Sequence, residues 1–166
     1  MEKTTVRSAA REISYTAMFV AIIAVCAWIA IPLPSNISIT LQTMGVCLAA
    51  GFLGWKRGLI AVAVYILLGL CGVPVFQGFT AGAAKLGSVT GGYIVGFLFT
   101  AAAVGLAADY IKVKSGWLRA AVLVAAMVVG VALCYLFGTI WFIYVYNAGA
   151  DTTVTFAAAL MTCVVP

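Results

Sequence analysis

The sequence predicts an all-α integral membrane protein with six transmembrane helices, and the prediction rests on its composition, its charge-free stretches and its basic residues. Of 166 residues, 66% are apolar and only 8% are charged, whereas about 25% are charged in a typical soluble domain. A soluble globule needs more polar surface than this chain can supply. A helix needs about 20 apolar residues to cross a bilayer. The chain therefore has length for about six spans in a single membrane domain, residues 1–166, and none for a soluble domain.

Charged and turn-forming residues set the limits of each span. The first charge-free stretch, 13–55, is too long for one helix, and the turn-forming cluster at 32–38 divides it. The next break is the basic pair Lys56-Arg57, and Asp109 and Asp151 end later stretches. The predicted spans are approximately 14–31, 41–55, 58–71, 90–108, 119–146 and 152–166. The last lacks a basic flank, and we expect it to be truncated.

The second and third spans are short for a membrane crossing. Short helices tilt, kink, pack inside a bundle or thin the bilayer locally. Gly51, Gly54, Gly58 and Gly69 lie at or near the ends of these two spans. We therefore expect close helix packing there.

The basic residues predict the orientation of the chain, because lysine and arginine are retained on the cytoplasmic side. In the predicted topology only Lys85 lies on the other side. The remaining eight of the nine basic residues share one face: Lys3, Arg7, Arg11, Lys56, Arg57, Lys112, Lys114 and Arg119. Both termini are therefore predicted to be cytoplasmic, with loops 32–40, 72–89 and 147–151 outside. The pI of about 9.1 follows from this topology and does not indicate a nucleic-acid partner.

The composition also excludes several kinds of chemistry. Histidine is absent, which excludes His-ligated metals and His-containing catalytic triads. No G-x-x-x-x-G-K-[ST] run is present to bind ATP phosphates. The four acids lie outside the predicted membrane centre, and the five cysteines are dispersed without a C-x-x-C pair. We expect no metal, no cofactor and no enzyme active site.

An ordered series of motifs resembles the BioY family, the biotin-specific substrate-capture (S) components of energy-coupling factor (ECF) transporters. The resemblance covers about residues 13–145, and no single motif would suffice. The motifs are Ile31-Pro32-Leu33-Pro34, Ile39-Thr40-Leu41-Gln42-Thr43-Met44-Gly45-Val46, Lys56-Arg57-Gly58, Leu68-Gly69-Leu70-Cys71-Gly72-Val73-Pro74-Val75-Phe76, Thr90-Gly91-Gly92-Tyr93, Gly96-Phe97 and Tyr135-Leu136-Phe137-Gly138-Thr139-Ile140-Trp141.

The resemblance implies the S-component fold in a multi-pass protein of the bacterial cell membrane. Such a protein binds biotin from the extracellular side as its transported ligand. For active transport it depends on a transmembrane coupling subunit and two cytoplasmic ATPase subunits. Family members continue past a proline like Pro166 with a Pro-x-Asp-x-x-Lys type run implicated in holding biotin, and this run is absent here. The alternatives are an S component for another vitamin, an integral-membrane enzyme acting on lipids and a non-catalytic assembly subunit.

Biotin requires partners for its ureido group, apolar walls and, for its carboxylate, a cation. Asn36, Gln42 and Thr43 are candidates for the ureido group, although Gln42 and Thr43 could instead only cap or bridge helices. Lys85 could pair with the carboxylate or remain a solvated loop lysine. Tyr93 and Trp141 suit either the pocket or the interfacial aromatic belt. The remaining candidates come from the 72–92 segment: Phe76, Thr80, Gly82, Gly91 and Gly92.

Small residues recur along one face of the first span, at Ser14, Ala17, Ala21 and Ala24. This spacing lets another helix approach closely. The Ala17-x-x-x-Ala21 pair resembles the motif that S components use against their coupling subunit. We expect partner docking here, with internal packing as the alternative.

Overall fold

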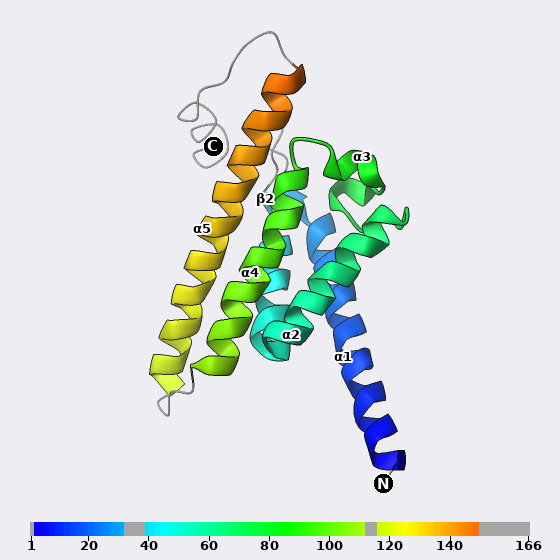
Figure 1. Cartoon of the computed structure of the whole chain (residues 1–166), viewed down its shortest axis with the longest axis vertical. Coiled ribbons are helices and arrows are strands. Elements are labelled where there is room, and N and C mark those ends of the chain that lie inside the picture. Colours follow the sequence, from blue (N-terminus) through cyan, green and yellow to red (C-terminus); the bar gives the residue numbers. More distant parts are fainter. Residues whose placement is uncertain (1, 32–38, 112–115, 150–166) are drawn as a thin grey trace.

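The computed structural model describes residues 2–31, 39–111 and 116–149, and this part of the chain is almost entirely helical (Figure 1). The prediction of an all-α protein is confirmed. The elements in chain order are α1 (Glu2–Trp28), β1 (Ala30–Ile31), β2 (Ile39–Thr40), α2 (Gln42–Leu70), η1 (Gln77–Phe79), α3 (Ala83–Leu86), α4 (Gly91–Tyr110) and α5 (Gly116–Gly149).

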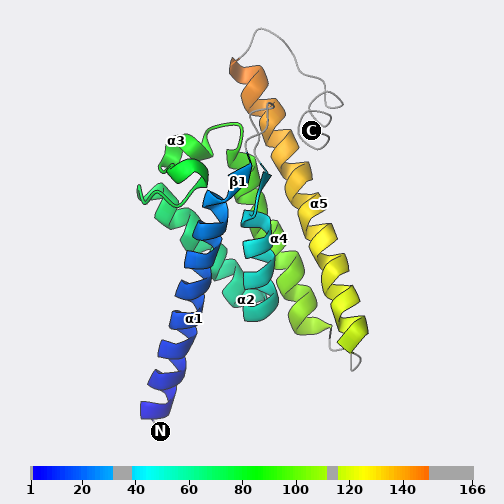
Figure 2. The same ribbon diagram turned by 180° about the vertical axis from the view of Figure 1, so that it is seen from behind.

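A short antiparallel strand pair follows α1 and leads into α2. Ala30 pairs with Thr40 and Ile31 with Ile39, and the backbone N–H of Leu41 donates to the carbonyl of Ile29 over 3.2 Å. Figure 2 shows β1 and α3 at the same end of the molecule, opposite the N-terminus. This pairing places the first residues of α2 at that end.

The helix α2 is two helical halves that fold back on each other at Gly54. The backbone of Gly54 has φ +78° and ψ −179°, which is not helical. Tyr65 lies 23 residues after Gln42, which would separate the two by about 35 Å in a straight helix, yet their side chains are hydrogen-bonded at 3.0 Å. A Cβ at Gly58 would lie only 2.8 Å from the Cα of Ala50, so the halves are in close contact. Both ends of α2 therefore lie near the strand pair. The turn at Gly54, called the apex of α2 below, lies at the opposite end (Figure 1).

Four described helices are long and apolar enough to cross a membrane: residues 10–28, 42–70, 91–110 and 116–147. The two halves of α2 correspond to the predicted spans 41–55 and 58–71, so these spans are joined by a kink within one assigned helix. The first helix begins well before the predicted span 14–31, because hydropathy marks the apolar part of a helix and not its polar first turns. The predicted span 152–166 lies outside the described residues.

The core lies between α1, α2 and α4, with α5 packed on the far side of α4 (Figure 1). Small residues bring α4 and α5 together. A Cβ at Gly96 would lie 2.7 Å from the sulfur of Cys134, and a Cβ at Gly130 would lie 3.1 Å from the Cα of Thr100. The Thr100 hydroxyl donates to the Gly130 carbonyl over 2.9 Å. Such close approach is typical of helix pairs in membranes.

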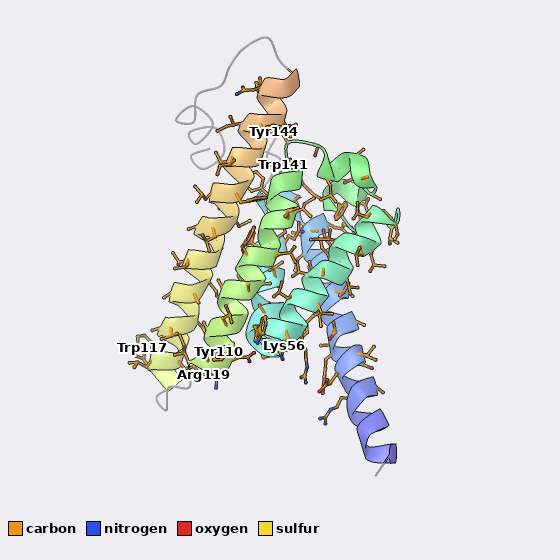
Figure 3. The ribbon with its side chains drawn as sticks, in the orientation of Figure 1. Lys56, Tyr110, Trp117, Arg119, Trp141 and Tyr144 are labelled. Carbon is orange, nitrogen blue, oxygen red and sulfur yellow. The ribbon has the colours of Figure 1, made fainter. Side chains whose placement is uncertain are left out.

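The described basic side chains are divided between the two ends of the helices. Lys56 and Arg119 lie at the end that holds the apex of α2 (Figure 3). Arg57 pairs there with Glu12 of α1, whereas Lys85 belongs to α3 at the opposite end. Lys85 therefore lies at the opposite end of the helices from Lys56, Arg57 and Arg119.

Candidate functional site

A cavity of about 90 Å³ lies at the end of the molecule where β2, the two ends of α2, the 72–89 connection and the start of α4 meet. Its walls also include part of α5. The lining residues are Thr40, Gln42, Thr43, Tyr65, Gln77, Lys85, Thr90, Tyr93, Ile94, Phe97, Val131, Cys134 and Tyr135. Amide, hydroxyl and ammonium groups thus face one space together with aromatic and aliphatic walls, which is the usual composition of a small-molecule site.

A chain of hydrogen bonds fixes one wall of the cavity. The Gln42 side-chain amide donates to the Tyr65 hydroxyl over 3.0 Å. That hydroxyl in turn donates to the Val75 carbonyl over 3.1 Å. Gln42 is 4% exposed and Tyr65 is fully buried, so both polar groups would be costly if unpaired. These two hydrogen bonds join both halves of α2 to the segment that precedes η1.

Four of the residues predicted from the sequence line the cavity: Gln42, Thr43, Lys85 and Tyr93. Gln42 and Thr43 are the first residues of α2, Tyr93 lies in the first turn of α4, and Lys85 belongs to α3. Lys85 is the cationic group that lines the cavity within the described part of the chain. Asn36 lies outside the described residues.

Three other predicted residues shape the 72–89 connection and do not line the cavity. The Phe76 ring is buried against Gly69 and meets Tyr65 edge to face, with ring centres 5.6 Å apart. Thr80 is exposed, and its hydroxyl donates to the Gln77 carbonyl over 2.8 Å. The N–H of Gly82, at φ +93°, donates to the carbonyl of Gly69 over 2.7 Å. Phe76 and Gly82 thus anchor the connection on the end of α2, and the Thr80 hydrogen bond lies within the connection.

Gly91, Gly92 and Trp141 make close contacts around the start of α4. A Cβ at Gly91 would overlap the Leu86 carbonyl, and a Cβ at Gly92 would overlap the Trp141 side chain. The Trp141 indole N–H donates to the Ser88 carbonyl over 3.2 Å. These residues therefore close the α3–α4 connection onto α5 and are not among those that line the cavity.

Tyr65 and Gln77 are the main polar groups that the sequence predictions missed. Tyr65 lies in an otherwise apolar stretch. The one sequence signal that could have identified it as a site residue is a polar hydroxyl within a predicted membrane span. Gln77 directly follows the Pro-Val-Phe motif. Thr90 and Tyr135 belong to motifs quoted above but were not among the predicted site residues. No group of three or more metal-ligating His, Cys, Asp or Glu side chains occurs among the described residues.

The small-residue face of α1 is only partly on the surface. Ala17 and Ala21 are exposed, but Ala24 is 6% exposed and belongs to the core. Ala24 is therefore packed within this chain, and partner docking stays a prediction for this face of α1. Ala24 is buried because α2 and η1 pack against α1 near its C-terminal end, where the Trp28 and Phe79 rings stack with centres 4.7 Å apart.

Comparisons with known proteins agree with this architecture. The chain matches the BioY family over residues 1–166. It is 41% identical over 128 residues to a biotin transporter BioY of Thermotoga maritima, covering 77% of this chain and 72% of that protein. It is 32% identical over 162 residues to a biotin transporter BioY of Rhodobacter capsulatus, covering 94% and 84%.

A solved structure shares the fold. The crystal structure of the S-component for biotin from an ECF-type ABC transporter matches with a TM-score of 0.79 and 29% identity, over 94% of this chain and 80% of that one. The relatives are named as transporters and not as enzymes. With its long apolar helices and its match along the whole sequence, the chain is a membrane protein that belongs to the BioY family.

Proposed function

We propose that this chain captures biotin in the cavity described above, as the S component of an ECF-type transporter. Its relatives are named as biotin transporters, and the matching structure is a biotin S-component. The transmembrane coupling subunit and the two cytoplasmic ATPases would supply the energy. The exposed Ala17 and Ala21 on α1 offer a close-packing surface for the coupling subunit.

The observation that carries the proposal is that the cavity combines groups suited to both ends of biotin. The Gln42 amide and the Thr43 hydroxyl suit the ureido group, which both donates and accepts hydrogen bonds. Tyr93 and Phe97 provide aromatic walls for the bicyclic ring. Lys85 provides a cation for the carboxylate.

We further propose that the cavity faces the outside. The end of the helices that carries Lys56, Arg57 and Arg119 would then be cytoplasmic, as the retention of basic residues on that side favours. The N-terminus lies at this same end (Figure 1). A sixth span at 152–166 would return the C-terminus to the cytoplasmic side.

The test is titration calorimetry of the purified protein in detergent with biotin, thiamine and riboflavin. Biotin is expected to bind and the other two vitamins are not. A preference for thiamine or riboflavin would refute the substrate assignment.

A second titration tests the role of Lys85. Replacing Lys85→Gln should weaken biotin binding by about 3- to 10-fold, between the effects of an exposed ion pair and a charged hydrogen bond. The same change should leave the affinity for biotin amide nearly unaltered, because that ligand has no carboxylate. Lys56→Gln at the other end of the molecule is the matched control and should change neither affinity. Equal losses for both ligands would refute the pairing.

A further inference from the structure

The orientation of the Gln42 amide is fixed by groups that lie behind it. The Val75 carbonyl can only accept a hydrogen bond, so the proton of the Tyr65 hydroxyl is committed to it at 3.1 Å. The Tyr65 oxygen then acts as an acceptor, and the group 3.0 Å away on Gln42 must be the amide nitrogen. With the amide reversed, two carbonyl oxygens would compete for one proton. The backbone of Val75 thus determines which end of the Gln42 amide faces Tyr65.

This orientation leaves a defined pair of groups for a ligand. Among the described residues, the side-chain hydrogen bond of Gln42 is the one from its amide nitrogen to Tyr65, which leaves the carbonyl oxygen and one further N–H for a ligand. Gln42 lines the cavity and is 4% exposed, so water competes weakly for these groups. One acceptor beside one donor complements the N–H and C=O of a cyclic urea.

We propose that Tyr65 is a positioning residue for ureido recognition, holding Gln42 so that its carbonyl oxygen accepts an N–H of the ligand. This inference rests on the proposed capture of biotin. Tyr65 itself is held by the Val75 carbonyl and by the edge-to-face contact of its ring with Phe76. The segment around Val75 and Phe76 thereby determines the hydrogen-bonding pattern of a side chain more than 30 residues earlier.

The test is a double-mutant cycle on the full chain with two ligands, biotin and an analogue methylated on both ureido nitrogens. Tyr65→Phe keeps the ring and removes the hydroxyl. It should lower the affinity for biotin by about 3- to 10-fold, which is the effect of one hydrogen bond in a buried network. The affinity for the methylated analogue should fall by less than about 2-fold. In a Gln42→Ala background, Tyr65→Phe should have no further effect on biotin. Tyr110→Phe, an exposed tyrosine at the far end of α4, is the matched control.

The outcomes separate this inference from the proposed function. If the unaltered chain does not bind biotin, both fail. If it binds biotin but Tyr65→Phe weakens both ligands equally, or weakens biotin as much in the Gln42→Ala background, Tyr65 acts on the ligand or on the fold and the positioning role is refuted.

A second variant tests the role of Gln42 even if the Tyr65→Phe protein does not fold. Gln42→Glu retains an acceptor oxygen but lacks the amide N–H groups. It should weaken biotin yet keep the preference for biotin over the methylated analogue. Loss of that preference would refute the acceptor role of Gln42.

Discussion

Replacing Gly54→Ala tests the reversal of α2, on which the cavity depends. The conformation of Gly54, φ +78° and ψ −179°, is essentially restricted to glycine and costs another residue about 1–3 kcal/mol. A Cβ there would also lie 2.5 Å and 2.6 Å from the two carboxylate oxygens of Asp109. One of these oxygens accepts the N–H of Trp55 over 2.9 Å.

The Asp109 carboxylate therefore caps the second half of α2, and displacing it adds the loss of a helix cap, about 0.5–2 kcal/mol. Together the two effects predict that Gly54→Ala lowers the free energy of unfolding by about 1.5–5 kcal/mol. The assay is reversible unfolding in mixed detergent micelles with increasing denaturing detergent, followed by circular dichroism.

Two comparisons make the Gly54 prediction specific. Gly51→Ala, in the same helix, would place a Cβ 4.0 Å from Val104 and should be neutral or slightly stabilising. In an Asp109→Ala background the cap is already lost, so Gly54→Ala should cost only the conformational part and the two changes should not be additive. A loss below about 0.5 kcal/mol for Gly54→Ala, smaller than the least strain expected, would refute the reasoning.

Three further predictions concern the cavity end and the α4–α5 contact. Trp141→Phe removes the N–H that donates to the Ser88 carbonyl. It should raise the dissociation rate of biotin by about 2- to 10-fold in a chase experiment. An unchanged rate would argue that Trp141 does not anchor the α3–α4 connection. Thr100→Val removes the donor to the Gly130 carbonyl and should lower the free energy of unfolding by about 0.5–1.5 kcal/mol, measured in mixed micelles, whereas a neutral effect would indicate that the bond contributes nothing net. Lys85→Cys in a cysteine-free chain should react with an impermeant thiol reagent added to intact cells, and its protection there would contradict an outward-facing cavity.

The sequence was sufficient to predict the long helices α1, α4 and α5 and the two helical halves of α2, but not the turn within α2 or the short helices η1 and α3. Charge-free stretches located α4 and α5 within a few residues, because breaks in hydropathy coincide with the ends of these helices. The basic pair Lys56-Arg57 suggested two spans where the structure has two halves of α2. The turn itself depends on Gly54 meeting Asp109 from another helix, a contact that no local pattern reveals.

The candidate site shows the same division between local and long-range information. Gln42, Thr43 and Tyr93 were predicted because polar residues stand at the starts of apolar helices. Tyr65 was missed because its partner Gln42 is 23 residues away and the two meet only through the reversal of α2. The burial of Ala24 could not be predicted, because spacing shows which residues share a helix face but not how far along the helix a neighbour covers that face.

The folded-back α2 has a mechanical consequence. Its two ends provide Gln42 and Tyr65 to the cavity, while its apex places Arg57 against Glu12 of α1 at the other end of the molecule. Because the halves are in contact at Ala50 and Gly58, they form one stiff lever. A displacement of the apex would therefore be transmitted to both cavity residues together, with their hydrogen bond intact.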